Sequence, residues 1–196
     1  FMEHPVIISG GGIIGCYVHL RLKQAGISSQ IIEKGPSLTS LSSNIRTISL
    51  NPSTYKLLLE IGIELESASV ETIKVSDGDG SGKIQFTANE VDEEALSHVA
   101  MFNELLEKIQ DKASNAIQFE SEIISVSKLD KLTKITLSNN CELQTSLLIG
   151  SDGRNSPVAQ LSNFISKTNN YKQTAFTFLA KEASDDNNST AIQIFS

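Results

Sequence analysis

The sequence predicts an α/β fold in which a parallel, Rossmann-like sheet carries an inserted antiparallel β layer. The first observation is an apolar run, 6–9, that leads into the glycine pattern of residues 10–15 and then into a helical pattern. The second is another apolar run that ends in Glu33, about 20 residues further on. The third is the segment 70–86, where strand-like alternation replaces the strand–helix pattern.

The glycine pattern fits G-x-G-x-x-G, and it follows a strand and opens a helix, as dinucleotide-binding turns do. Gly10 permits a tight turn, Gly12 lets a pyrophosphate approach the backbone, and Gly15 lets helix and strand pack closely. The helix N-terminus offers unpaired N–H groups to phosphates, and Glu33 can accept hydrogen bonds from a ribose. The alternative is a glycine turn that binds nothing. The complete register of strand, glycines, helix, strand and acid favours the dinucleotide site.

The first strand is expected at residues 5–9, because this run is apolar and rich in β-branched residues. The helix after Gly12 is expected to run to about Ala25, with Gly26 as a C-terminal cap. Three apolar residues stand at helical spacing on one face: Ile14, Val18 and Leu22.

A second strand is expected at 29–33, followed by a loop at 37–44 that is rich in Ser and Asn. Arg46 stands alone in a run that changes from polar to apolar. Asn51-Pro52 predicts a helix start with Pro at the first helical position. That helix carries Leu57, Leu58 and Ile61 and is expected to stop at Gly62.

Residues 70–76 and 83–86 alternate on either side of the turn cluster 77–82, which predicts an antiparallel β-hairpin. Asp77, Asp79 and Ser81 are spaced like the start of a calcium loop. The downstream Glu ligand of such a loop is absent, so a solvated turn is favoured.

A helix is expected at 102–113, followed by alternating runs at 117–127 and 132–138 and then a turn. Leu147–Ile149 read as a further buried strand, which ends in a Gly-Ser-Asp-Gly turn that opens a helix. Ligands bind at the carboxyl ends of strands in α/β sheets, so Asp152 is expected to face the same crevice as Gly12. The alternative is that Asp152 is a turn or capping residue. The runs 174–180 and 190–195 are expected to be strands that extend the inserted layer.

Composition excludes several classes of function. The formal net charge of −7 argues against a nucleic-acid surface. Cys16 and Cys141 lie far apart without metal-ligand spacing, so we expect no metal site and no disulfide framework. The three histidines are scattered and Ser151 is not in a G-x-S-x-G elbow, so no hydrolase is supported. No apolar run is long enough to span a bilayer, and no signal peptide precedes the first strand.

Two signatures, in this order, resemble the FAD-dependent aromatic hydroxylases, the single-component flavoprotein monooxygenases. The glycine pattern with Glu33-Lys34 is similar to their ADP-binding start, and the run 148–158 is similar to their Asp-Gly motif, with Ser151 where Ala is usual. The run 44–50 resembles their D-x-R-x-x-A-L segment, whose arginine lies along the flavin. Three further segments, 75–77, 95–99 and 171–175, resemble connecting segments in the ubiquinone-biosynthesis branch of this family.

The resemblance implies a glutathione-reductase-like FAD-binding domain at 1–69 and 96–170. Residues 70–95 and 171–196 would then form part of an incomplete substrate-domain sheet. It implies hydroxylation of a polyprenyl phenol with FAD, NAD(P)H and O₂, and no side chain is assigned as a catalytic acid or base. The implied cofactor contacts are Gly10, Gly12, Ile14, Gly15, Glu33, Lys34, Arg46, Ile123 by its backbone, Asp152 and Gly153.

The sequence also departs from the family pattern. Asn44 replaces the usual Asp, Ala159 stands where many members have Arg, and Met101-Phe102 replaces a usual Glu-Asn pair. Members of the family carry a second flavin motif, Gly-Asp, much later in the chain, and this later motif is absent from the sequence. These features predict an N-terminal fragment without catalytic activity. The expected location is the cytoplasm, and the resemblance implies association with the inner-membrane surface or with a ubiquinone-biosynthesis complex. The alternatives are a non-catalytic nucleotide-binding fragment, or another flavin oxidoreductase such as a halogenase or amine oxidase.

Overall fold

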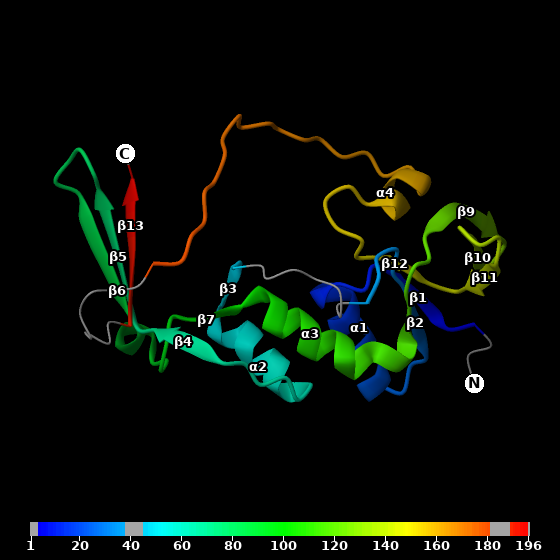
Figure 1. The fold of residues 1–196 in the computed structure, drawn as a ribbon, viewed down its shortest axis with the longest axis horizontal. Helices are drawn as coiled ribbons and strands as arrows, with labels where there is room; N and C mark the ends of the chain where they lie inside the picture. Colours follow the sequence, from blue (N-terminus) through cyan, green and yellow to red (C-terminus); the bar gives the residue numbers. More distant parts are fainter. Residues whose placement is uncertain (1–3, 38–44, 181–188, 196) are drawn as a thin grey trace. The chain divides into compact units, whose positions relative to one another are not determined.

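The computed structural model describes residues 4–37, 45–180 and 189–195 (Figure 1). The chain divides into two compact units, Phe1–Ser42 with Leu106–Thr174 and Ser43–Leu105 with Ala175–Ser196. The predicted division into an FAD-binding domain and part of a substrate domain is a functional one and stays a prediction. Of the predicted loop 37–44, all but residue 37 lies outside the described residues, and so does Asn44.

The first unit is built on a four-stranded parallel sheet with the strand order β12-β1-β2-β8. β1 (Val6–Ser9) is fully buried and lies between β12 (Leu148–Gly150) and β2 (Ser29–Ile32). Near-continuous apolar strands of this kind are typical of sheets covered on both faces. The parallel sheet predicted from these runs is confirmed.

Helix α1 (Ile13–Gln24) follows β1, as predicted, and Gly26 just beyond it adopts a positive φ of +73°. The expected apolar face is wrong, however, because Ile14 is 64% exposed. The buried residues of this helix are Gly15, Cys16, His19 and Leu20. Close packing of the helix start on the turn requires small residues there, and Gly15 and Cys16 occupy these positions while Ile14 faces outward.

A three-stranded antiparallel meander, β11-β10-β9, completes the core of the first unit. Its strands are β9 (Ile123–Leu129), β10 (Leu132–Leu137) and β11 (Glu142–Thr145), and the short helix α4 (Pro157–Leu161) follows β12. The core cluster combines residues of the parallel sheet, the meander and α4: Ile7, Ile32, Ile123, Ile135, Leu137 and Val158.

The predicted single run 117–127 is two strands, which corrects that expectation. β8 (Ile117–Gln118) pairs with β2 in parallel, whereas β9 turns away into the meander. The backbone between them is redirected at Glu120, which has a positive φ of +53°. The alternation of apolar and polar residues over 117–127 could not by itself show that this run contributes to two different sheets.

The second unit contains the sheet β3-β7-β4, whose strands pair antiparallel. They are β3 (Thr47–Leu50), β7 (Ser97–Met101) and β4 (Ser67–Val70), and the sequence did not predict this sheet. Helix α2 (Pro52–Glu60) begins as predicted, with the Asn51 side chain accepting the Thr54 N–H at 2.7 Å. Helix α3 (Phe102–Ala113) has the predicted bounds and continues into the first unit.

The predicted hairpin is confirmed as β5 (Thr72–Asp77) and β6 (Lys83–Thr87), joined in a sheet with the order β13-β5-β6. The expected strand at 190–195 is β13 (Thr190–Phe195), which pairs with β5 in parallel. The expected strand at 174–180 is wrong. This segment is not a strand and Phe176 is 88% exposed. Strands need a partner for their backbone groups, and the described residues provide none here.

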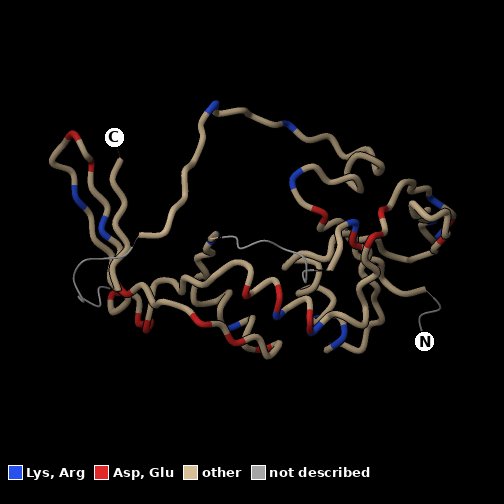
Figure 2. Tube along the Cα trace, viewed as in Figure 1, with Lys and Arg blue, Asp and Glu red and all other residues tan. Residues whose placement is uncertain are grey.

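Short 3₁₀ helices lie at Ala88–Val91 in the second unit and at Ser114–Ala116 in the first. Acidic residues gather in the second unit at and after the end of α2 (Glu60, Glu64 and Glu66) and on the segment after β6, where Lys56 of α2 pairs with Glu93 at 3.2 Å (Figure 2). Within the part of the chain that the structure describes, no helix is long and apolar enough to cross a membrane.

Candidate functional site

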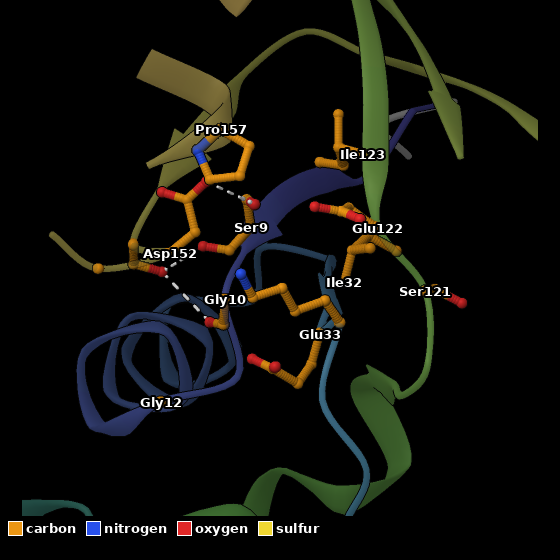
Figure 3. Close-up of a pocket in the computed structure, with 13 residues that line it drawn as sticks. Ser9, Gly10, Gly12, Ile32, Glu33, Ser121, Glu122, Ile123, Asp152 and Pro157 are labelled. Carbon is orange, nitrogen blue, oxygen red and sulfur yellow. Dashed lines mark hydrogen bonds between the residues drawn. The ribbon is translucent and has the colours of Figure 1, made fainter. Parts of the chain in front are cut away.

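A cavity of about 250 Å³ opens at the carboxyl end of the parallel sheet in the first unit (Figure 3). Its walls come from the ends of β1, β2 and β12 and from the segment that enters β9. The lining residues are Ser9, Gly10, Gly12, Ile32, Glu33, Lys34, Ser121, Glu122, Ile123, Ser151, Asp152, Gly153 and Pro157. In Figure 3, Asp152 and Pro157 lie on one side of it, and Ser121, Glu122 and Ile123 lie on the other.

The glycine turn between β1 and α1 is crowded at two of its three motif positions. Gly10 has a φ of +100°, and a Cβ there would stand 2.5 Å from the Ser151 carbonyl oxygen. A Cβ on Gly15 would stand less than 3.0 Å from the Gly10 carbonyl oxygen. Each position therefore requires glycine for a local steric reason.

Gly12 differs from the other two glycines because a Cβ on it would meet nothing within 4 Å. It is the N-cap of α1, and no side chain caps this helix. The first N–H groups of a helix have no intrahelical partner, and the helix dipole places partial positive charge there. Open space at Gly12, beside the cavity that it lines, is the space a phosphate would use.

Glu33 follows the last residue of β2 and faces the glycine turn, as predicted. Its Oε2 accepts the Gly11 N–H and its Oε1 accepts the Gly35 N–H, both at 2.6 Å. A carboxylate has about four acceptor sites, so two backbone bonds orient the group and leave capacity for a ligand's hydroxyl groups.

Asp152 lies at the other end of the cavity, after β12. Its Oδ2 accepts the Val158 N–H at 3.1 Å and the Ser9 hydroxyl at 3.3 Å. Its Oδ1 is buried, and no partner for it exists among the described residues. Asp152 therefore supports the backbone that enters α4, which agrees with the capping alternative, and it also lines the crevice shared with Gly12.

The structure brings most of the predicted contact residues to this cavity, with three exceptions. Ile14 and Gly15 belong to α1 and do not line it. Arg46 belongs to the second unit, where its guanidinium lies 4.3 Å from the centre of the Phe102 ring and its carbonyl accepts the Phe102 N–H at 2.9 Å. Its role beside a flavin stays a prediction.

Several cavity residues were not identified from the sequence. The Ser151 hydroxyl donates to the Ser9 carbonyl at 2.8 Å, which ties the end of β12 to the end of β1. Ser121 and Glu122 precede β9 and reach the cavity only because β8 and β9 separate there. The spacing of residues along the sequence does not predict contacts of this kind. The one available signal is Ser151 itself, which stands where the aromatic hydroxylases usually have Ala.

The hydrogen-bond donors and acceptors that line the cavity fit a dinucleotide such as FAD. Glu33 offers acceptors for ribose hydroxyls, the uncapped α1 start offers donors for phosphates, and Asp152 offers an acceptor further along. The fold and site therefore define an α/β dinucleotide-binding protein of the glutathione-reductase-like class.

Comparison with known proteins specifies the family. The family model described as "FAD binding domain" matches residues 3–191, and the chain belongs to this family. The ubiquinone biosynthesis monooxygenase COQ6 of Caenorhabditis elegans is 26% identical over 213 residues, covering 98% of this chain and 47% of that protein. Monooxygenase 1 of Arabidopsis thaliana is 29% identical over 165 residues, covering 80% of this chain and 40% of that protein.

Among solved structures, the Klebsiella pneumoniae HpxO complex with FAD and uric acid superposes with a TM-score of 0.64 at 20% identity. That match covers 81% of this chain and 41% of the other, and it shows the fold. The two relatives from Caenorhabditis elegans and Arabidopsis thaliana are both named monooxygenases, and this chain spans about half the length of the curated relatives it matches.

Proposed function

We propose that the chain binds FAD in this cavity, with the ADP half held between Glu33 and the start of α1. The observation that carries the proposal is the Glu33 carboxylate, fixed by two backbone N–H groups at the edge of the cavity that Gly12 also lines. The ribose hydroxyls would donate to Glu33, and the pyrophosphate would accept N–H groups at Gly12 and Ile14. Lys34 and Ile123 also line the cavity. Ile123 would contact the cofactor through its backbone, and Asp152 and Gly153 would face the flavin half.

Glu33→Ala is expected to raise the Kd for FAD and for ADP about tenfold, because hydrogen bonds to a charged group are stronger than neutral ones. Fluorescence titration of FAD and calorimetric titration of ADP measure this change. Glu122→Ala is the matched control, since this glutamate lines the same cavity without bonding to the glycine turn. Unchanged affinity in Glu33→Ala, or an equal loss in Glu122→Ala, would remove Glu33 from the site.

The Glu33 carboxylate is also expected to select between nucleotides with a free ribose 2′-hydroxyl and nucleotides with a 2′-phosphate. A negative charge beside the ribose favours a free 2′-hydroxyl and repels a 2′-phosphate. ADP should therefore bind more tightly than 2′,5′-ADP to the unmodified chain, and Glu33→Ala should narrow that difference.

We further propose that the complete enzyme is a monooxygenase that hydroxylates a polyprenyl phenol in ubiquinone biosynthesis, such as 2-octaprenyl-6-methoxyphenol. Support comes from the COQ6 relatives and from the match to the FAD-binding domain family. NAD(P)H and O₂ are the co-substrates proposed, and bound FAD would supply the redox chemistry. Association with the membrane surface or with a biosynthetic complex is part of this proposal, because the substrate carries a polyprenyl tail.

A chain that contributes the nucleotide half alone would bind FAD without hydroxylating a substrate. Oxygen chemistry on a flavin needs a closed pocket that excludes water, and the β13-β5-β6 sheet leaves Ile192 70% exposed. We therefore expect no hydroxylated product from the 196-residue chain supplied with FAD, NADH and a short-chain polyprenyl phenol, measured by chromatography. Stoichiometric product would contradict this expectation, and absence of FAD binding would favour the non-catalytic alternative.

A further inference from the structure

Among the described residues, two buried side-chain atoms have no hydrogen-bond partner: Gln110 Oε1 and Asp152 Oδ1. Each belongs to a side chain whose other polar atom bonds to the end of β1 or to the glycine turn. Asp152 bonds to the Ser9 hydroxyl, and Gln110 donates from Nε2 to the Gly11 carbonyl at 2.6 Å. Gln110 lies in the part of α3 that belongs to the first unit and does not line the cavity.

The Gly11 carbonyl accepts one further bond, from the Cys16 thiol at 3.3 Å. A thiol is a weak donor, so the Gln110 amide is the strong anchor of this carbonyl. Because a peptide group is planar and trans, the Gly11 carbonyl and the Gly12 N–H point in opposite directions. Fixing the carbonyl on Gln110 therefore directs the Gly12 N–H away from α3.

Gly11 also connects Gln110 to Glu33. The Gly11 N–H donates to Glu33 Oε2 at 2.6 Å, while its carbonyl is held by Gln110. Both backbone groups of one residue are thus engaged, one by the ribose-binding acid and one by α3. Rotation of the Gly11 backbone would disturb the acid and the phosphate-binding N–H together.

The buried Oε1 of Gln110 argues that stability alone does not explain this residue. A buried carbonyl oxygen without a partner carries a desolvation cost, which an apolar side chain of similar size would avoid. Replacing the amide by a hydrocarbon removes that cost and removes one hydrogen bond, so the two effects on folding oppose each other.

We propose that Gln110 is a positioning residue of the dinucleotide site, which acts by fixing the Gly11 peptide and makes no contact with the ligand. The inference rests on the proposed FAD and ADP site. It assigns to α3 the task of holding the turn in the conformation that presents the Gly12 N–H to a pyrophosphate.

The test combines a binding and a stability measurement on the 196-residue chain. Gln110→Leu should raise the Kd for ADP and for FAD about tenfold, while its midpoint of thermal unfolding without ligand stays equal to or above that of the unmodified chain. Ile109→Val is the matched control: this neighbour on α3 is fully buried, and its truncation should lower the unfolding midpoint and leave ADP affinity within twofold. Gln110→Met, which has a more adaptable side chain, replaces the leucine variant if that variant does not fold.

The outcomes separate the two proposals. Loss of affinity with unchanged or increased stability supports the positioning role. A lower unfolding midpoint with unchanged ADP affinity would overturn it and leave Gln110 as a packing residue. If the unmodified chain binds neither ADP nor FAD, the proposed function itself fails, and the role of Gln110 fails with it.

Discussion

Two glycine-rich turns in this chain look alike in composition and differ in structure. The turn between β1 and α1 holds Gly10, Gly11 and Gly12, with Gly15 in the first turn of α1, and the turn between β5 and β6 holds Gly78, Gly80 and Gly82. At the first of these two turns, a Cβ on Gly10 would meet backbone atoms of Ser151 and Asp152, and one on Gly15 would meet the Gly10 carbonyl and the Ser151 hydroxyl. In the second, a Cβ on Gly80 would meet only the Asp77 side chain, and one on Gly82 would stand 3.7 Å from it.

The difference lies in what surrounds each turn. The β1–α1 turn is enclosed by a parallel sheet, and side chains from distant segments bond to it: Glu33, Gln110 and Ser151. The β5–β6 turn bonds within itself, by Asp79 N–H to Asp77 Oδ1 at 3.3 Å and by Asp77 N–H to the Gly82 carbonyl at 2.9 Å. One bond reaches a distant segment, from the Gly78 N–H to the Phe195 carbonyl of β13 at 2.6 Å. Glycine is therefore required by packing at Gly10 and Gly15, whereas Gly80 and Gly82 of the hairpin face only the Asp77 side chain.

The largest effect that would test this comparison comes from adding one methyl group to each turn. Gly15→Ala places a Cβ less than 3.0 Å from the Gly10 carbonyl oxygen, a backbone atom that cannot move without opening the turn. We expect a loss of more than about 3 kcal/mol of unfolding free energy, at the upper end of overpacking costs. Gly82→Ala, which meets only the Asp77 Cβ, should change the free energy by less than about 0.5 kcal/mol, like other surface substitutions.

Urea unfolding followed by circular dichroism measures both variants. Gly12→Ala is an informative third variant, because its Cβ meets nothing within 4 Å. It should fold normally and bind ADP less tightly, since the methyl group occupies the space for a phosphate. Equal losses of stability in Gly15→Ala and Gly82→Ala would contradict the distinction between the two turns.

The parts of the fold that the sequence predicted are those with a local pattern. The glycine turn, the acid after β2, the β5–β6 hairpin and α3 each depend on residues close together in sequence. The surrounding sequence also distinguished the turn between β1 and α1 from the calcium-like turn between β5 and β6, although both are glycine-rich.

The missed parts depend on contacts between distant segments. β3 pairs with β7 through Thr47 and Met101, and neither strand alternates clearly enough to be recognised alone. In the candidate site, Gln110 and Ser151 act through hydrogen bonds to residues 99 and 142 positions away. The segment 174–180 shows the opposite error: it has a strand pattern, but no strand within 4–37, 45–180 or 189–195 pairs with it.

A smaller effect concerns the burial of Cys16, which donates to the Gly11 carbonyl inside the first turn. Burial, and then the negative charge of Glu33, raises the pKa of its thiol from 9.0 to about 12. Below pH 9 the thiol is protonated in both the folded and the unfolded chain. Above pH 9 only the unfolded chain loses the proton, so stability should fall by about 1.4 kcal/mol for each pH unit until the folded pKa is reached.

The measurement compares the free energy of unfolding at pH 8.5 and pH 10 in three chains, because other groups also titrate in this range. Cys16→Ala removes the buried thiol, so its loss of stability between the two pH values should be smaller than that of the unmodified chain by about 1.4 kcal/mol. Cys141→Ala is the control for the removal of a thiol as such, since this cysteine is exposed in the turn between β10 and β11. If Cys16→Ala and the unmodified chain lose stability equally, water reaches the thiol, and the first turn is more open than its hydrogen bonds indicate.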